Sequence, residues 1–372
     1  MAPVPQEQIS TLLAERVAAG DFPSAVYLIS EKGEQVFADA VGNAVVDPYL
    51  IAASLHTIYD LASLTKPLVT ALLCAQRIEL GELTLDAAVG NYLPEFDRTD
   101  KQIVTLRHLL THSSGLPAWR PLYILTEGEP ERAAGQIANE PLEYPPGTRV
   151  VYSDLGFIVL GLMLERMTGK NISVLAREEI FDPLNLKNTF FNPEYAFQTG
   201  IAACEKGNRY EQNSAREAGL GDYTSWRQSV IWGEVHDANA YFLGGSAGHA
   251  GLFSTVLDAN SMASQFLAGV SQLLKSKTCV LFRTNLTEGL DEARSFGWQL
   301  AATSGSTAGI DLAADSFGHT GFTGTSCWVD PADERIFILL TNRTHARALP
   351  FENINAVRRQ FHSLGVKALN RL

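Results

Sequence analysis

The amino-terminal part of the chain shows a helical pattern followed by two strand-like patterns. Residues 10–20 carry apolar positions at the spacing of one helical face. Residues 24–30 and 35–40 are rich in apolar and β-branched side chains, and the turn residues 31–34 separate them. The pattern predicts a short amphipathic helix and then a β-hairpin.

The carboxyl-terminal part shows the same two patterns in reverse order. Residues 325–329 and 335–341 are strongly apolar, and the turn residues 330–333 (DPAD) join them. Residues 353–369 then return to helical spacing. We therefore expect both ends of the chain to contribute strands and a helix.

The middle of the chain is helical in pattern. Helical apolar spacing is found over residues 68–80, 106–110, 157–167 and 172–180, with Gly/Pro-rich stretches between them. Strands at both ends with helices between them predict an α+β fold. One antiparallel sheet flanked by helices would be built from residues 1–60 and 250–372, and a mostly helical domain would be inserted over residues 61–249. A cleft between the two is the expected place for a small-molecule site.

Composition narrows the classes of function. The chain has 372 residues, of which 46% are hydrophobic and 19% charged, so it is long and apolar enough to bury a large core. Its formal net charge is −12, and no dense Lys/Arg block is present. Nucleic acids and anionic membrane surfaces require a basic footprint, so neither is expected as a partner.

Location is predicted from what the sequence lacks. The first residues show no basic segment followed by an apolar core, and no apolar run approaches the roughly 20 residues of a membrane-spanning helix. We therefore expect a cytoplasmic protein, or a periplasmic one if a leader has been removed. The scattered cysteines form no CxxC pair and are expected to be packed thiols: Cys74, Cys204, Cys279 and Cys327.

The first chemical candidate is the pair Ser63 and Lys66. A spacing of three residues on a helix places the two side chains on one face, within hydrogen-bonding reach. A serine hydroxyl becomes a nucleophile when a neighbouring base takes its proton. Pro67 lacks the N–H that would bond to the Ser63 carbonyl, which is tolerated only near a helix start. Ser63 is therefore expected in the first turn, where free N–H groups can hold an oxyanion.

Two further motifs follow in the same chain. Residues 144–157 (YPPGTRVVYSDLGF) lead from a loop into a helix, and residues 318–324 (GHTGFTG) precede a strand. Together with SxxK, these segments resemble the three signature elements of the serine β-lactamase and penicillin-binding protein superfamily. The closest match is its class C-like branch of esterases, D-amino-acid peptidases and amidases. Residues 106–117 and 248–255 add supporting phrases, so the resemblance covers about residues 10–360.

The resemblance implies roles for particular residues. Ser63 would be the acylated nucleophile, Lys66 would hold it and tune its proton, and Tyr152 would be the base that shares the proton with Lys66. A free tyrosine has a pKa near 10, and we expect the lysine cation to lower the pKa of Tyr152. By analogy, the backbone N–H groups of Ser63 and Phe322 would form the oxyanion hole. No metal or organic cofactor is implied.

Two positions depart from the superfamily pattern. The second motif usually ends in Asn, but here it ends in Asp154, which would either pair with Lys66 or repel an anionic substrate. The third motif is usually Lys-Thr-Gly, but here it is His319, Thr320 and Gly321. Histidine titrates near pH 6.5, so His319 need not carry the charge that a lysine would use to bind a substrate carboxylate. Both departures disfavour efficient β-lactam hydrolysis.

Other polar residues have weaker support. Arg343 follows an apolar strand and could bind a substrate carboxylate in place of the missing lysine, although a surface salt bridge is the simpler interpretation. Glu234, His236, Asp237 and His249 could be imagined around a metal, but no recognised ligand spacing supports that. His236 and Asp237 more simply anchor a loop, and His249 is a possible wall residue of the cleft.

The leading functional hypothesis is a serine hydrolase of an ester or amide. Residues 235–237 and 248–255 resemble bacterial relatives that act on muropeptides, so a cell-wall fragment is a possible substrate. The alternatives are a β-lactamase or D,D-peptidase, a non-catalytic binding protein that has kept the pocket, and a metal hydrolase. The sequence predicts a small-molecule or peptide partner and leaves the oligomeric state open.

Overall fold

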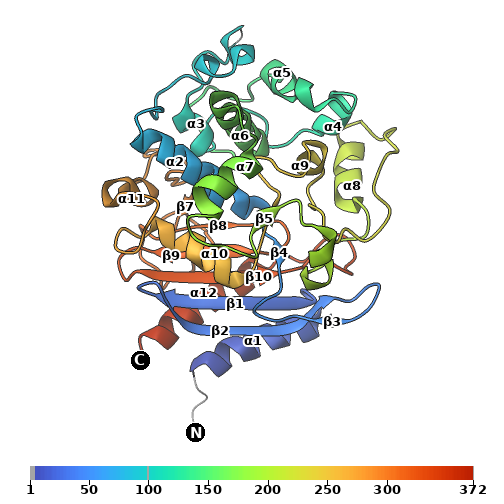
Figure 1. Cartoon of the computed structure of the whole chain (residues 1–372), viewed down its shortest axis with the longest axis vertical. Helices are drawn as coiled ribbons and strands as arrows, with labels where there is room; N and C mark the ends of the chain where they lie inside the picture. The colour runs from blue at the N-terminus through green and yellow to red at the C-terminus, as the bar shows by residue number, and fades with distance from the viewer. Residues whose placement is uncertain (1–4, 99, 372) are drawn as a thin grey trace.

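A seven-stranded antiparallel sheet is built from both ends of the chain. The computed structural model describes residues 5–98 and 100–371. The strand order is β3-β2-β1-β10-β9-β8-β7, with bounds β1 (Ser24–Glu31), β2 (Glu34–Val45), β3 (Ile51–Ala52), β7 (Gln299–Leu300), β8 (Phe317–Thr320), β9 (Ser326–Asp330) and β10 (Arg335–Thr341). Val26 of β1 lies opposite Leu340 of β10, so the first and last strands of the sequence are neighbours (Figure 1).

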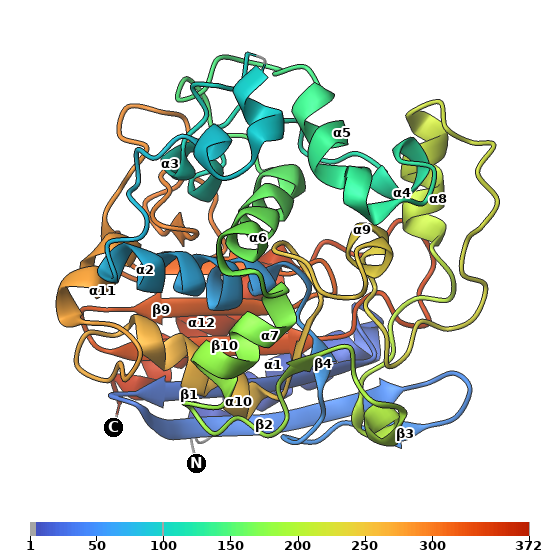
Figure 2. The same ribbon diagram turned by 45° about the horizontal axis from the view of Figure 1, so that its top comes forward.

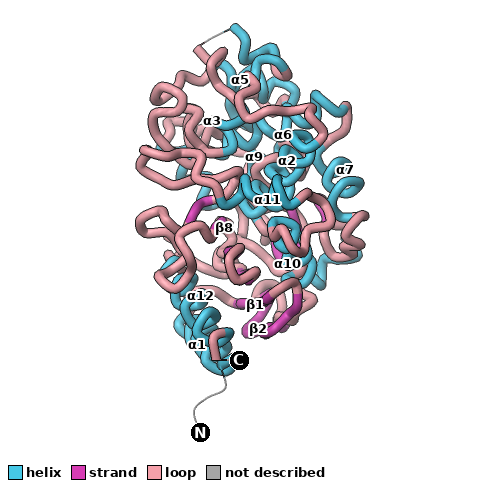
Figure 3. Tube along the Cα trace, turned by 90° about the vertical axis from the view of Figure 1, so that its left-hand side faces the viewer, coloured by secondary structure: helices cyan, strands magenta, loops and turns pink. Residues whose placement is uncertain are grey.

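Both faces of this sheet are covered, which explains why its central strands are almost entirely apolar. Successive side chains of a strand point to opposite faces. In β10, Phe337 and Leu339 pack against the terminal helices, whereas Ile336 and Ile338 belong to the larger core on the other side. The terminal helices α1 (Pro5–Ala19) and α12 (Asn355–Leu369) lie side by side across the first face, as Figure 3 shows.

The opposite face carries the remaining helices, which extend away from the sheet (Figure 2). They are α2 (Leu72–Glu79), α3 (Leu106–Leu110), α4 (Leu122–Leu125), α5 (Ala133–Asn139), α6 (Asp154–Thr168), α7 (Ile172–Ala176), α8 (Arg209–Glu217), α9 (Ala238–Phe242), α10 (Val256–Ala263) and α11 (Ser276–Arg283). Short 3₁₀ segments are η1 (Ala62–Leu64), η3 (Val89–Asn91), η4 (Pro94–Arg98), η5 (Pro130–Arg132), η7 (Tyr195–Gly200) and η8 (Ser264–Phe266). Two π-helical segments are η2 (Lys66–Ala71) and η6 (Arg177–Phe181).

A small second sheet connects the large sheet to the helical part. Its strand order is β4-β6-β5, with bounds β4 (Tyr59–Asp60), β6 (Leu252–Ser254) and β5 (Phe190–Phe191). β4 leads directly into η1, and β6 follows the glycine-rich loop 244–251. The second sheet therefore brings these two segments together at the edge of the helical layer.

The α+β prediction is confirmed, and the predicted elements are found within a few residues of their expected ends. The hairpin 24–40, the strands 325–341 and both terminal helices are present. The division into residues 1–60 plus 250–372 and residues 61–249 stays a prediction. All four cysteines are free and buried. Within the described part of the chain, no helix is both long and apolar enough to cross a membrane.

Candidate active site

Ser63 lies at a sharp change of direction between a strand and a helix. At the end of β4, the Asp60 carboxylate accepts the N–H of Ala62 at 2.8 Å. Ala62 has a φ of +48°, an unfavourable region for a residue with a Cβ, and Ser63 follows in the 3₁₀ turn η1. Pro67 stands early in the π-helical segment η2, as expected near a helix start. This turn keeps the Ser63 side chain accessible, whereas Leu64 and Thr65 are buried.

Lys66 is fully buried behind Ser63 and is surrounded by acceptors. Its Nζ donates to Ser63 Oγ at 2.9 Å and to the His249 carbonyl at 3.1 Å. It also lies 2.7 Å from Asp154 Oδ1. Burial by itself lowers the pKa of Lys66, but Asp154 and Tyr152 outweigh it, so the pKa lies above its ordinary value. Lys66 is therefore held as an ammonium ion, and Asp154 pairs with it.

Tyr152 enters the site just before helix α6. Lys66 Nζ lies 5.0 Å from the centre of its ring. Burial raises the pKa of Tyr152 and Asp154 raises it further, while Lys66 and Ser63 act in the opposite direction. Lys66 therefore lowers the Tyr152 pKa as expected, but the net shift is upward, because the low-dielectric surroundings penalise a phenolate more than one cation stabilises it.

The third motif forms one edge of the site at the end of β8. His319 is buried, and its Nδ1 donates to the carbonyl of Thr320 at 2.9 Å. Burial and the nearby cations Lys66 and Arg294 hold the pKa of His319 well below its usual range, so the imidazole is neutral. Gly321 has no room for a side chain, because a Cβ there would lie 2.1 Å from Thr325 Oγ1. The glycine thus lets the strand end approach the loop that carries Ser63.

Two backbone N–H groups are available beside the nucleophile. Ser63 stands in the first turn of η1, and Phe322 lies in the loop after β8. Among the hydrogen bonds of the described residues, neither N–H is donated to a protein acceptor. Both therefore meet the basic requirement for oxyanion donors.

A cleft of about 620 Å³ contains most of the predicted site residues. Lys66 lies behind the wall rather than in it. The predicted residues that line the cleft are Ser63, Tyr152, Asp154, His319, Thr320, Gly321, Phe322 and Arg343. Three motifs that are far apart in the sequence thus surround one cavity.

One wall of the cleft is basic, and sequence reasoning found only part of it. Arg294, Arg343 and Arg358 all line the cleft. Arg343 donates to the carbonyls of Phe322 and Glu352, both at 2.7 Å, and Arg358 donates to the carbonyl of Gly321 at 3.1 Å. Among the ion pairs of the described residues, none involves Arg343 or Arg358, so the surface salt bridge considered for Arg343 is not found there.

Arg294 and Arg358 are buried, and Arg343 is half-buried. Burial and then the charge of Arg343 lower the pKa of Arg358 to about 9. Arg294 pairs with Glu292 at 2.5 Å, and its guanidinium carbon lies 5.9 Å from the centre of the Tyr152 ring. No local sequence motif identifies Arg294 or Arg358 as a cleft residue, because each reaches the cleft from a different part of the fold.

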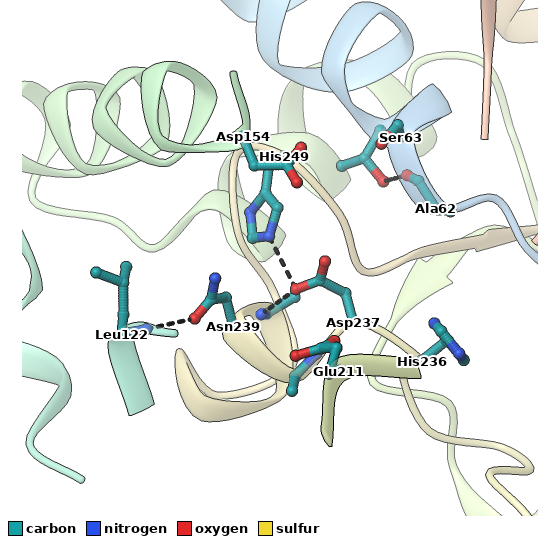
Figure 4. Close-up of polar contacts among 12 residues, drawn as sticks. Ala62, Ser63, Leu122, Asp154, Glu211, His236, Asp237, Asn239 and His249 are labelled. Atoms are coloured by element: carbon teal, nitrogen blue, oxygen red, sulfur yellow. Dashed lines mark hydrogen bonds and ion pairs between the residues drawn. The ribbon is translucent and has the colours of Figure 1, made fainter. Parts of the chain in front are cut away.

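Acidic and aromatic residues from the helical part also line the cleft. Trp119, Tyr210, Glu211 and Asp237 line it. Asp237 accepts hydrogen bonds from His249 Nε2 at 2.9 Å and from the N–H of Ala240 at 2.8 Å, so it also caps helix α9 (Figure 4).

Burial and the charge of Asp237 raise the pKa of Glu211 to about 8. His236 pairs with Glu205, with 2.9 Å between His236 Nε2 and the carboxylate. Within the described residues, no group of three or more His, Cys, Asp or Glu side chains has a geometry that could hold a metal ion. Glu234, His236, Asp237 and His249 instead form pairs with neighbouring side chains, with Arg227 for Glu234, Glu205 for His236, and each other for Asp237 and His249.

Comparison with known proteins identifies the family. The sequence matches the family described as Beta-lactamase over residues 9–359, almost the whole chain. The chain belongs to the β-lactamase family. It is a hydrolase of the serine β-lactamase and penicillin-binding protein superfamily, as the motif resemblance implied.

Similar proteins carry several different names. An Escherichia coli (strain K12) protein named "Putative D-alanyl-D-alanine carboxypeptidase" is 31% identical over 371 residues, covering 91% of this chain and 82% of that protein. The N-acetylmuramyl-L-alanine amidase of Bacillus subtilis (strain 168) is 30% identical over 377 residues, covering 92% and 82%. Among solved structures, EstCE1, a hydrolase with promiscuous acyltransferase activity, superposes with a TM-score of 0.75 at 22% identity and covers 98% of both chains. This last likeness shows the fold.

Proposed function

We propose that Ser63 attacks an ester or amide carbonyl and forms an acyl-enzyme, which water then hydrolyses. The observation that carries the proposal is the contact of Lys66 Nζ with Ser63 Oγ at 2.9 Å, in a cleft that also contains Tyr152. An ammonium ion at this position stabilises negative charge that develops on the serine oxygen. The free N–H groups of Ser63 and Phe322 receive the carbonyl oxygen as it becomes an oxyanion.

The proton of Ser63 passes to Tyr152 in its ionised form. Lys66 is a poor proton acceptor because it already carries its proton: its Nζ donates to Ser63 Oγ and to the His249 carbonyl, lies 2.7 Å from Asp154 Oδ1, and has a raised pKa. Tyr152 faces both Lys66 and Ser63, which favour the phenolate. Lys66 therefore acts as a fixed cation, and Tyr152 serves as the general base and later as the acid that protonates the leaving group.

The basic wall favours a substrate that carries a carboxylate close to the scissile bond. Arg343 and Arg358 lie beside Phe322 and hydrogen-bond only to carbonyl and amide oxygens, so their charges are not neutralised by a protein carboxylate. The curated relatives are named for a D-alanyl-D-alanine carboxypeptidase and an N-acetylmuramyl-L-alanine amidase. Both names describe cleavage of an amide in a molecule with a carboxylate. We infer that the natural substrate is a muropeptide fragment of this kind.

β-Lactam hydrolysis or D,D-peptidase activity is the second candidate. The carboxylate of such a substrate would meet the same arginines, which supports it. The neutral His319 in place of a lysine argues against it, because one cation of the usual binding set is missing. A non-catalytic binding role has less support, since Lys66 would then be a fully buried charge without a use.

The test is intact-mass spectrometry of the wild type and Ser63→Ala after exposure to a fluorophosphonate, p-nitrophenyl butyrate and a penicillin. We expect the fluorophosphonate adduct and ester turnover in the wild type alone. Release of alanine from D-alanyl-D-alanine peptides and of L-alanine from N-acetylmuramyl-L-alanine then distinguishes the two amide substrates.

Each outcome has a direct meaning. Labelling of Ser63→Ala at the same rate as the wild type would overturn the assignment of the nucleophile. A lasting penicillin adduct on the wild type would move the β-lactam alternative to first place. If neither the wild type nor Ser63→Ala reacts with any of the probes, the result would support a non-catalytic binding protein.

A further inference from the structure

His112 stands directly behind the candidate base Tyr152, at the end of helix α3. It is almost completely buried and has a φ of +56°, in the left-handed region that residues with a Cβ adopt at a cost. Residues 106–117, which contain it, belong to the superfamily resemblance but carry no role there. A strained and buried histidine beside a cleft, however, requires a specific explanation.

His112 holds the chain on both sides of Tyr152. Its backbone carbonyl accepts the N–H of Val151 at 2.9 Å. Its side-chain Nδ1 accepts the N–H of Ser153 at 3.0 Å. The residues immediately before and after Tyr152 are thus bound to one and the same residue, which fixes the position of the Tyr152 Cα.

The ring of His112 also contacts the ring of Tyr152. The two ring centres are 4.5 Å apart, and the ring of Phe157 lies 5.1 Å away on the same imidazole. Three side chains are therefore packed into one aromatic group behind the base. This packing restricts the direction in which the phenol points.

The hydrogen bonds of His112 require one tautomer. Because Nδ1 accepts the N–H of Ser153, the ring proton resides on Nε2, which is buried and has no hydrogen-bond partner among the described residues. Burial lowers the pKa of His112 well below its usual value, and the charges of Arg294 and Lys66 that face it act in the same direction. The ring is neutral and Nδ1 stays an acceptor.

We propose that His112 is a positioning residue that places the Tyr152 hydroxyl between Ser63 and Lys66. The proposal rests on the proposed role of Tyr152 as the base. His112 does not line the cleft, so it acts through Tyr152 rather than by touching substrate. A displacement of the phenol by about 1 Å is expected to lower the rate about 100-fold.

The test compares two substitutions at the same position. His112→Asn keeps an acceptor close to the place of Nδ1 and tolerates a positive φ. We expect it to keep kcat for p-nitrophenyl butyrate within about fivefold of the wild type. His112→Ala removes the acceptor and the ring, and we expect kcat to fall about 100-fold with little change in KM.

His108 provides the matched control. It lies in helix α3, about one turn before His112, and its Nδ1 accepts the N–H of Thr105 at 3.2 Å as part of the helix cap. His108→Ala should lower Tm through loss of this cap but leave kcat unchanged. A comparable loss of kcat in His108→Ala would mean that any destabilisation of α3 lowers the rate, and would overturn the proposal.

A double-mutant cycle separates this proposal from the role of Tyr152 itself. If His112 acts through Tyr152, then His112→Ala combined with Tyr152→Phe should be no slower than Tyr152→Phe alone. If the fold-losses in kcat of the two single variants multiply in the double variant, the positioning role of His112 would be overturned. Wild-type kcat in Tyr152→Phe would instead overturn the proposed function of Tyr152. Full activity in His112→Ala beside an inactive Tyr152→Phe would overturn only the inference about His112.

Discussion

The reactivity of Ser63 depends on where protons reside in its neighbours. Lys66 keeps its proton because Asp154 lies 2.7 Å away. Tyr152 keeps its proton because burial raises its pKa. At neutral pH both Lys66 and Tyr152 therefore carry their protons, and the proposed active form contains a Tyr152 phenolate beside the Lys66 ammonium.

The first prediction concerns pH. Because the base must lose a proton and its pKa lies above 10, log(kcat/KM) should rise by about one per pH unit between pH 7 and 9. Lys66 does not limit this rise, since its pKa is raised above its ordinary value. The measurement is ester hydrolysis corrected for the uncatalysed rate. A profile that is flat over this interval would exclude Tyr152 as the base.

A second prediction concerns Asp154, which raises the pKa of both Tyr152 and Lys66. Asp154→Asn restores the residue that the superfamily motif usually has and removes one negative charge. The pKa of Tyr152 should fall, so the rising part of the pH profile should move to lower pH. Activity at pH 7 should therefore increase relative to the wild type. A shift to higher pH would show that the carboxylate has another role.

The residues of the site differ in how far sequence could predict them. Ser63, Lys66 and Tyr152 stand in local motifs, because their chemistry requires a fixed spacing on a helix or at its start. Arg294 and Arg358 have no such requirement. A guanidinium on a long side chain can reach the same cavity from many backbone positions, so only the folded chain shows which arginines reach it.

At the level of elements, helix α12 packs closely on the sheet, and this close packing determines which side chains the helix can carry at Gly365 and His362. A Cβ at Gly365 would lie 2.7 Å from Ile29 Cδ1 and 2.9 Å from Phe337 Cε1, so the helix approaches the sheet at this glycine. His362, one turn earlier, is completely buried, and its Nδ1 donates to the carbonyl of Thr307 at 2.7 Å. The helix thus carries a polar group into an apolar layer.

Acid stability should report on this buried histidine. Burial lowers the pKa of His362 to about 3, whereas an unfolded histidine titrates near 6.5. Below pH 6.5 only the unfolded chain takes up this proton, so the free energy of unfolding should fall by about 1.4 kcal/mol per pH unit until about pH 3. The contribution is absent above pH 6.5.

Urea unfolding of the wild type and His362→Asn between pH 7 and 4 tests this prediction. The variant lacks the titrating group, so its stability should depend less steeply on pH, while the other groups cancel in the difference. Equal slopes in both proteins would show that His362 is protonated or exposed in the native state.

The π-helical segment η2 shows what sequence patterns miss at this scale. Helical spacing correctly predicted a helix over residues 68–80, but α-helical and π-helical hydrogen bonding share almost the same apolar pattern. Lys66 and Pro67 begin the π segment, at the point where the chain leaves the turn of Ser63. Such short π segments are frequent at functional sites.

At the scale of the whole molecule, the charge of the cleft differs in sign from the net charge of the chain. The chain carries a formal charge of −12, yet three arginines line one wall of its cleft. Arg358 comes from the last helix, and Arg294 and Arg343 come from loops before and after the final strands. The net charge therefore did not predict the sign of this wall.

The fourth prediction follows from this wall. Arg358→Gln should raise KM for a carboxylate-bearing amide about 10- to 100-fold, because a charged hydrogen bond is lost. A neutral ester should be affected much less. Arg359→Gln removes the same charge from the next residue, which does not line the cleft, and should leave both KM values unchanged. Equal effects of the two substitutions on KM would show that the substrate responds to the overall charge of the region and does not contact Arg358 directly.

The sequence by itself determined the fold class and the family and indicated the candidate trio Ser63, Lys66 and Tyr152, because periodicity and short motifs record local requirements. Only the tertiary structure decided that Asp154 pairs with Lys66 and that the Tyr152 pKa is raised. It also decided which arginines meet in the cleft and that His112 holds both neighbours of Tyr152. These properties depend on distances between segments remote in sequence and on the dielectric of a buried site. Neither is encoded at any single position of the chain.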